Sequence, residues 1–140
     1  MEEARTHILL VDDEPALLRL MESFLKGLGY QIHPAGSAAE ALRVFREDPG
    51  RFSLVVADVT MPDVSGKDLA LDLLKINPNL LVLICSGYPF EVKSLPPEVQ
   101  SCFGVLQKPF LPKMLAKSIE SLLRKKDEVE PPASPGLTGS

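Results

Sequence analysis

The sequence predicts a doubly wound α/β fold with a parallel five-stranded sheet. Short apolar runs alternate with amphipathic helical patterns, which is typical of β-α units. Three of the runs, each interpreted as a strand buried on both faces, are followed within two residues by charged side chains. They are residues 8–11 before Asp12 and Asp13, residues 54–57 before Asp58, and residues 103–106 before Lys108. Because parallel strands end at one edge of an open sheet, these four side chains are expected to meet in one crevice.

The first helix and the second strand have clear boundaries. Pro15 suits the first turn of a helix, and apolar residues recur at helical spacing until Gly29 ends it. Residues 30–35 then predict a short strand. Pro34 lacks the amide hydrogen that a central strand donates, so we expect this strand at an edge of the sheet.

Breaks and caps define the next two helices. Ser37 and Glu40 have the spacing of a capping box, and the helix that they begin ends at the Asp-Pro-Gly of residues 48–50. The third strand follows. A loop at residues 61–66 then precedes a helix over residues 67–76.

The last part of the domain predicts two strands and a final helix, with one irregular segment. Residues 80–85 and 102–106 predict strands, and residues 115–123 carry the apolar spacing of a helix. Residues 89–101 could line a helix, but two consecutive prolines remove two amide donors from it. The fourth helix is therefore expected to be short, displaced or irregular.

Length and composition indicate one domain. A chain of 140 residues can bury a sizeable core, and a hydrophobic content of 45% is ordinary for a globular protein. We assign residues 1–126 to the domain. Residues 127–140 are rich in Glu, Pro, Ser and Gly and cannot offset the entropy of ordering, so we expect a disordered tail or a severed linker.

Charge and targeting signals exclude several classes of protein. The net charge of −4 does not provide the positive charge that is typical of proteins that bind nucleic acid. The chain also has no apolar run of about eighteen residues that could span a membrane. The N-terminus lacks the regions of a signal peptide, so a cytoplasmic location is expected. Cys85 and Cys102 are interpreted as small buried thiols, and His7 and His33 as ordinary strand residues.

The charges expected in the crevice favour a metal ion and a phosphoryl group. The carboxylates of Asp12, Asp13 and Asp58 would repel one another unless they are protonated or share a cation, and hard oxygen ligands suit Mg²⁺. Lys108 adds a positive charge. Taken singly, each residue is more often a surface charge, but their common place at strand ends favours a site. Asp12 is also a candidate N-cap of the first helix, which is compatible with a metal role.

Four motifs in register resemble the response-regulator receiver domain over roughly residues 5–125. They are Val-Asp-Asp-Glu-Pro at 11–15, Ala-Asp-Val-Thr-Met-Pro at 57–62 with Gly66, Cys-Ser-Gly at 85–87, and Gln-Lys-Pro-Phe at 107–110. The resemblance implies a flavodoxin-like (βα)5 fold with strand order 2-1-3-4-5. It also implies a role in two-component phosphorelay signalling.

The resemblance assigns phosphoryl chemistry to three side chains. Asp58 would accept a phosphoryl group from a phosphohistidine on a sensor histidine kinase or a histidine phosphotransfer protein. Lys108 would pair with one phosphoryl oxygen, and Ser86 would donate its hydroxyl to another. The Lys108–Pro109 bond is expected to be cis. A carboxylate is a weak nucleophile, so charge neutralisation and alignment would supply most of the rate.

The resemblance likewise implies the ligands of Mg²⁺. Asp13 would bind the ion directly, and Asp12 directly or through water. Asp58 and the backbone carbonyl of Thr60 would complete the protein ligands.

Two features concern the output and the lifetime of the phosphorylated form. Val105 stands where the family commonly has an aromatic switch residue, and its small branched side chain has no large rotamer change to signal phosphorylation. Tyr88, two residues past Ser86, either obstructs the hydrolytic water or points to solvent. Output would be contact with a downstream protein target, onward phosphotransfer, or a homodimer through the fourth helix, the fifth strand and the last helix.

Other functions fit the sequence less well. A flavodoxin-like cofactor binder would meet repulsion between its phosphate and the acids at residues 12–14. A phosphatase of the haloacid dehalogenase type needs an acid two residues after its nucleophile, where Thr60 stands. A phosphorylation-independent adaptor would be favoured by missing acids or a missing lysine, and none is missing. A receiver module of a larger hybrid histidine kinase stays open, because residues 86–88 and 105–110 look most similar to such receivers.

Overall fold

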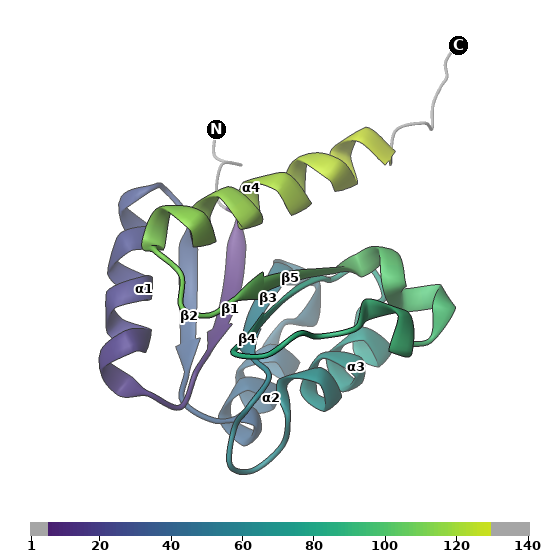
Figure 1. Ribbon diagram of the computed structural model, residues 1–140, viewed down its shortest axis with the longest axis horizontal. Helices are drawn as coiled ribbons and strands as arrows, with labels where there is room; N and C mark the ends of the chain where they lie inside the picture. Colours follow the sequence, from purple (N-terminus) through teal and green to yellow (C-terminus); the bar gives the residue numbers. More distant parts are fainter. Residues whose placement is uncertain (1–5, 130–140) are drawn as a thin grey trace.

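A five-stranded parallel sheet forms the centre of the computed structural model, which describes residues 6–129. The strands lie in the order β2-β1-β3-β4-β5, which confirms the predicted topology (Figure 1). Their bounds are β1 His7–Val11, β2 Gln31–Ala35, β3 Phe52–Asp58, β4 Leu81–Ser86 and β5 Phe103–Gln107. β2 lies at an edge, as its proline predicted. All pairings are parallel, so the carboxyl ends of the strands share one edge of the sheet.

Helices cover both faces of the sheet. One face carries α1 Pro15–Gly27 and α4 Pro112–Val129, and the opposite face carries α2 Ala38–Glu47 and α3 Gly66–Ile76 (Figure 1). Two helical layers around a parallel sheet bury both of its faces. The strands therefore form a rigid frame for the loops at their carboxyl ends.

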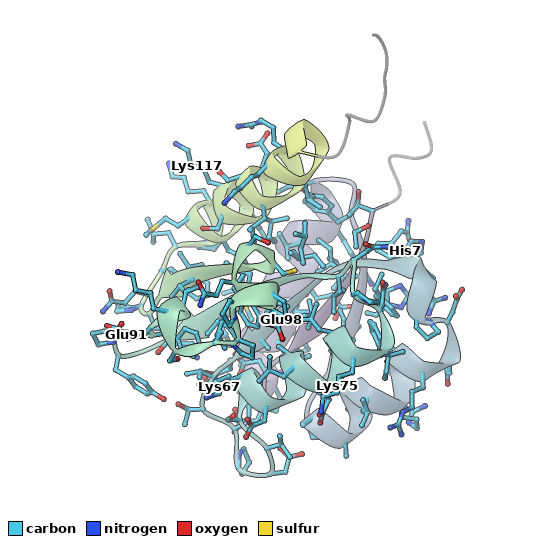
Figure 2. The ribbon with its side chains drawn as sticks, turned by 90° about the vertical axis from the view of Figure 1, so that its right-hand side faces the viewer. His7, Lys67, Lys75, Glu91, Glu98 and Lys117 are labelled. Atoms are coloured by element: carbon cyan, nitrogen blue, oxygen red, sulfur yellow. The ribbon has the colours of Figure 1, made fainter. Side chains whose placement is uncertain are left out.

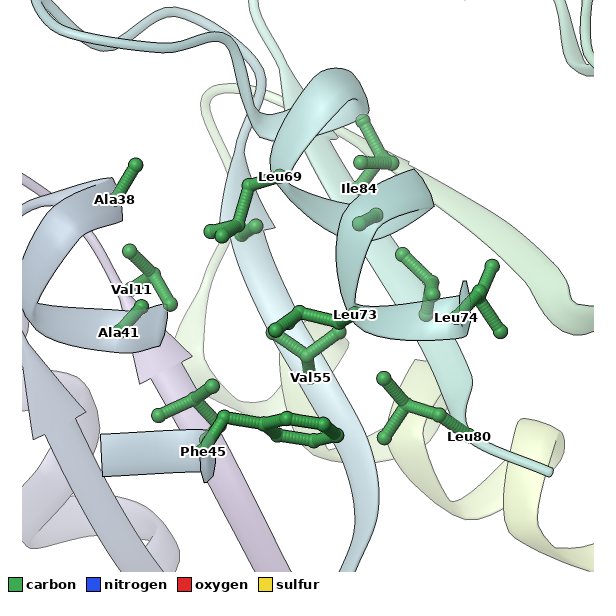
Figure 3. Packing of buried hydrophobic residues seen from close by; sticks show 14 of the residues in the cluster. Val11, Ala38, Ala41, Phe45, Val55, Leu69, Leu73, Leu74, Leu80 and Ile84 are labelled. Carbon is green, nitrogen blue, oxygen red and sulfur yellow. The ribbon is translucent and has the colours of Figure 1, made fainter. Parts of the chain in front are cut away.

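Two apolar layers hold the helices against the sheet. Under α2 and α3, the fully buried ring of Phe45 stacks on Phe52 with ring centroids 5.3 Å apart, in the layer that Figure 3 shows. On the other face, Leu25 of α1 and Leu115 and Ile119 of α4 have no exposed surface. Burial of each such side chain contributes about 1.5–3 kcal/mol.

Side-chain caps begin the two helices beside the third strand. The Ser37 hydroxyl accepts a hydrogen bond from the amide of Glu40 at 3.1 Å. The carboxylate of Glu40 accepts from the amide of Gly36 at 2.9 Å, so the second half of the predicted capping box is displaced by one residue. Ser65 caps α3 in the same way, by accepting from the amide of Asp68 at 3.1 Å.

The segment between β4 and β5 folds without an α-helix. It contains two 3₁₀ helices, Val92–Ser94 and Pro97–Cys102, which confirms the prediction of an irregular fourth helix. Pro97 begins the second one, at a position where the missing amide costs nothing. Leu95 between them is 3% exposed and anchors the segment on the core.

The fifth strand and one thiol are more exposed than the sequence predicted. β5 pairs with β4 alone in the described part of the chain, so it forms an edge of the sheet. Phe103 and Leu106 are buried in it, but Val105 is 39% exposed, and the prediction of burial on both faces is wrong for this strand.

Cys102 ends a 3₁₀ helix and is partly exposed, so the prediction of a buried thiol is wrong for Cys102 and is confirmed for Cys85.

The last helix extends beyond the expected end of the domain. α4 continues to Val129, past residue 126, so residues 127–129 are helical. Residues 130–140, the remainder of the expected tail, lie outside the described residues. Among the described helices, none has the length and apolar character needed to cross a membrane.

Candidate functional site

Three carboxylates converge at the carboxyl edge of the sheet. Asp12 and Asp13 follow β1, and Asp58 is the last residue of β3, the neighbouring strand. One oxygen from each carboxylate lies within 4.8 Å of the other two. The sheet topology thus brings together the three acids that the sequence singled out. Like charges at this distance repel one another, which favours a shared cation.

Asp12 is the more deeply buried of the two buried acids in this cluster, since Asp58 is 8% exposed. Asp12 itself is 3% exposed, and its Oδ1 accepts a hydrogen bond from the amide of Glu14 at 2.9 Å. Burial raises the pKa of Asp12, and the charges of Asp58 and Asp13 add to that effect against the opposing influence of the Glu14 amide and Lys108. The interpretation of Asp12 as the helix N-cap is wrong, because Glu14 occupies the N-cap position. Asp12 instead closes the turn that precedes the helix.

Lys108 reaches the cluster from the loop after β5. Its Nζ lies 3.0 Å from Oδ2 of Asp58 and 3.8 Å from Oδ2 of Asp12. Burial alone would lower the pKa of Lys108, but the hydrogen bond and charge of Asp58, with the charge of Asp12, raise it overall. The ammonium therefore stays charged beside the carboxylates. The Lys108–Pro109 bond is cis, as expected.

Asp58 is held at both carboxylate oxygens. Oδ2 receives the hydrogen bond from Lys108, and Oδ1 accepts one from the backbone amide of Thr60 at 3.1 Å. The loop after β3 folds back closely on the strand, and a Cβ at Gly66 would collide with the carbonyl oxygen of Asp58. Glycine is required there because α3 begins against the backbone of the acidic residue. The role of the Thr60 amide in orienting the carboxylate could not be predicted, because no sequence pattern records a backbone donor.

Ser86 ends β4 beside this pocket and is completely buried. Its hydroxyl donates to the carbonyl of Tyr88 at 2.5 Å and accepts from the amide of Tyr88 at 3.2 Å. The hydroxyl is thus engaged with its own loop, and it must rotate before it can donate to a ligand in the pocket. The side chain of Tyr88 is 54% exposed.

The thiol of Cys85, which lies beside the pocket, is expected to be unreactive. Cys85 pairs with Asp58 across the β3–β4 register and is 3% exposed. Burial raises its pKa to about 12, despite the positive charge of Lys108. A thiol in that state is protonated at neutral pH and is a poor nucleophile.

A shallow hollow adjoins the acidic pocket on its α3 side. It is lined by Val59, which follows Asp58, by Lys67 of α3, and by Tyr88 and Glu91 of the β4–β5 connection. Figure 2 places Lys67 and Glu91 on the side of the molecule away from His7, which begins β1. The hollow therefore opens at the same end of the sheet as the three carboxylates.

A doubly wound domain with three acids and a lysine at its strand ends defines a recognisable class of protein. The chain belongs to the response regulator receiver domain family, whose model matches residues 8–120. It is 37% identical over 122 residues to the sensor kinase CckA of Brucella abortus (strain 2308), covering 86% of this chain and 13% of that protein. It is 32% identical over 123 residues to the transcriptional regulatory protein GlrR of Escherichia coli (strain K12), covering 88% and 27%. The chain thus spans a small part of each relative.

Solved structures have the same fold. A response regulator receiver domain protein from Clostridium thermocellum matches with a TM-score of 0.76 and 27% identity, over 89% of this chain and 98% of that one. The receiver domain of the hybrid histidine kinase CckA matches with a TM-score of 0.71 and 28% identity, over 84% and 98%. The response regulator TrrA from Thermotoga maritima, in complex with Mg²⁺-BeF, matches with a TM-score of 0.70 and 28% identity, over 84% and 98%.

Proposed function

We propose that this receiver domain accepts a phosphoryl group on Asp58 from a phosphohistidine, in a reaction that requires Mg²⁺. The observation that carries the proposal is the convergence of Asp12, Asp13 and Asp58 with the ammonium of Lys108. The donor would be a sensor histidine kinase or a histidine phosphotransfer protein. Phosphorylation would then alter a face that binds a downstream protein.

The chemical step forms one bond and breaks another. An Asp58 carboxylate oxygen attacks phosphorus while the phosphorus–nitrogen bond of the phosphohistidine breaks, and the imidazole nitrogen takes the electron pair. Asp58 presents its oxygens in a fixed orientation, because the Thr60 amide and Lys108 each hold one of them. Lys108 is already beside the carboxylate, so its ammonium can follow a phosphoryl oxygen with little reorganisation.

The donor set of the pocket fits Mg²⁺. Asp12, Asp13 and Asp58 offer only hard oxygen ligands, and a bound cation would stabilise the buried carboxylate of Asp12 as an anion. With the backbone carbonyl of Thr60, these residues would hold the ion. When bound, it would neutralise charge on the phosphoryl oxygens. TrrA, a relative of this chain in fold and sequence, was solved with Mg²⁺-BeF.

The assignment of Asp58 is tested with acetyl phosphate as the donor. The protein is incubated with and without MgCl2, and its intact mass is followed over time. We expect one phosphoryl addition in the presence of Mg²⁺ and none after chelation. The matched control, Asp58→Asn, has nearly the same side-chain shape without the nucleophile. Equal modification of that variant would refute Asp58 as the acceptor.

Lys108 is proposed to transmit the change to β5 and α4. Lys108→Ala removes the ammonium that contacts Asp58, so we expect phosphorylation to persist at a reduced rate while amide shifts in β5 and α4 disappear. The measurement is an amide NMR spectrum with and without beryllofluoride. Lys113→Ala, on the first turn of α4, is the control for loss of charge. Wild-type shifts in Lys108→Ala would contradict the role.

A second function is favoured by the relatives. The match to CckA supports a receiver module that works within a hybrid histidine kinase, where the phosphoryl group passes onward to a histidine phosphotransfer protein. A phosphorylation-independent adaptor is the alternative of another class. A partner that binds wild type and Asp58→Asn equally, with or without phosphodonor, would favour the adaptor.

A further inference from the structure

The carboxylate of Asp63 bridges two elements on the α2 side of the acidic pocket. Asp63 lies in the loop between β3 and α3, and its Oδ2 accepts hydrogen bonds from the amides of Ala38 at 3.1 Å and Ala39 at 3.3 Å. These amides open α2. Ser37 accepts from the next amide, that of Glu40. Asp63 thus caps a helix from twenty-five residues away in the chain, and the first three amides of α2 all have acceptors.

The charges at this contact are complementary. The first amides of a helix carry a partial positive charge, and a carboxylate is the acceptor that they favour. Hydrogen bonds from the amide of Val64, and also from those of Ala39 and Ala38, lower the pKa of Asp63. The side chain is therefore ionised at neutral pH, which strengthens the contact although the residue itself is exposed.

The loop that Asp63 fastens carries part of the acidic pocket. Thr60 lies three residues earlier, and its amide orients Oδ1 of Asp58. Between the two, Met61 is 9% exposed and packs in the same core layer as Ala38. At the far end of the loop, the amide of Gly66 donates to the carbonyl of Val59 at 3.1 Å. Asp63 lies between Thr60 and Gly66, and its hydrogen bonds hold this part of the loop against α2.

We propose that Asp63 is a positioning residue, which holds the β3–α3 loop on α2 and thereby fixes the backbone of Thr60 for the metal site. This inference rests on the proposed function, in which the Thr60 carbonyl is a ligand of Mg²⁺. In this role Asp63 would contact neither the phosphoryl group nor the metal. Its loss should weaken Mg²⁺ binding without impairing the step that follows once the ion is bound.

The test compares Asp63→Ala with Asp63→Asn and with Asp72→Ala. Asp72→Ala removes the same charge from an exposed position on α3. The probe is MgCl2 alone, followed by titration calorimetry and by the amide signal of Thr60. We expect the dissociation constant of Mg²⁺ to rise about tenfold in Asp63→Ala, as is common for residues that orient metal ligands. Asp63→Asn, which keeps an acceptor oxygen, should show a smaller rise, and Asp72→Ala none.

The kinetic readout separates positioning from a general structural defect. With acetyl phosphate, Asp63→Ala should need more Mg²⁺ to reach half its maximal rate, but its maximal rate at saturating Mg²⁺ should equal that of wild type. Hydrogen exchange of the Thr60 amide should be faster in Asp63→Ala. An unchanged Mg²⁺ constant, or a reduced maximal rate with an unchanged constant, would overturn the proposal.

Removal of the Ala38 amide, which donates a hydrogen bond to Asp63, provides an independent check. Ala38 is the first residue of α2, where proline is tolerated, and Ala38→Pro removes one amide that Asp63 accepts from. The double variant with Asp63→Ala should bind Mg²⁺ no more weakly than Asp63→Ala alone, and additive losses would contradict the contact. If wild type binds Mg²⁺ but is never phosphorylated, the proposed function fails while the titrations still decide the role of Asp63.

Discussion

At the scale of single residues, the three acids of the pocket differ in their surroundings. Asp12 is buried and bound to the amide of Glu14, Asp58 is held by Thr60 and Lys108, and Asp13 is exposed. The sequence predicted which acids meet, because each follows a strand of one parallel sheet. It could not predict these partners, since they depend on side-chain rotation and on loop paths that no periodic pattern records.

Asp13 is expected to contribute more to Mg²⁺ affinity than Asp12. An exposed carboxylate can bind an ion directly without losing a protein hydrogen bond, whereas Asp12 already accepts from a backbone amide. Asp13→Asn should therefore raise the dissociation constant of Mg²⁺ more than Asp12→Asn does, as titration calorimetry would measure. Equal or reversed effects would overturn this order.

The two histidines form a pair that makes folding sensitive to pH. Nδ1 of His7 lies 2.9 Å from Nε2 of His33, on the adjacent strands β1 and β2. Burial lowers the pKa of His33, and the charges of Arg51, His7 and Lys26 lower it further. The unfolded chain therefore binds more protons than the folded chain just below the ordinary histidine pKa of about 6.5.

The free energy of unfolding should accordingly fall as the pH drops through about 6.5, because protonation then favours the unfolded chain. Urea titrations between pH 7.5 and pH 5.5, a window of about one unit on each side of that pKa, would measure the change. His33→Gln should show a flatter dependence over this window. A wild-type slope in that variant would place the titrating group elsewhere.

At the scale of elements, the sequence predicted most boundaries closely. Apolar periodicity located the strands, and caps such as Ser37 located helix starts, because both signals are local. The segment between β4 and β5 was predicted correctly as irregular, since prolines act on the backbone directly. The burial of β5 was misjudged, because exposure at a sheet edge depends on the whole topology.

The loop after β4 is expected to control the lifetime of the phosphorylated form. The Ser86 hydroxyl must turn away from the carbonyl of Tyr88 to donate to a phosphoryl oxygen. We expect the loop to bring the Tyr88 ring over the pocket once that hydrogen bond is lost. Tyr88→Ala should hasten dephosphorylation several-fold, because in-line water would be less obstructed, while Tyr88→Phe should decay like wild type. The measurement is the decay of the phosphorylated form in excess Mg²⁺. Unchanged decay in Tyr88→Ala would favour the solvent-pointing alternative, with which the 54% exposure of this side chain agrees.

At the scale of the whole molecule, topology explains why residues distant in sequence form one site. The strand order places β1 beside β3, so Asp12, Asp13 and Asp58 share one edge, and the loop after β5 brings Lys108 across β4. Asp58 and Lys108 are fifty residues apart in the chain, yet they are hydrogen-bonded. The doubly wound class could be predicted from alternation alone, whereas the contact of Asp63 with α2 could not, because an exposed loop acid leaves no pattern.

Chemical mapping of the phosphorylated residue tests directly whether Asp58 is the phosphoacceptor. The protein is treated with acetyl phosphate in the presence or absence of Mg²⁺ and then with borohydride, which reduces an aspartyl phosphate to homoserine, and its peptides are analysed by mass spectrometry. We expect homoserine at position 58 alone, and only in the sample that contained Mg²⁺. Conversion at position 12 or 13, or equal conversion at position 58 without the metal, would contradict it.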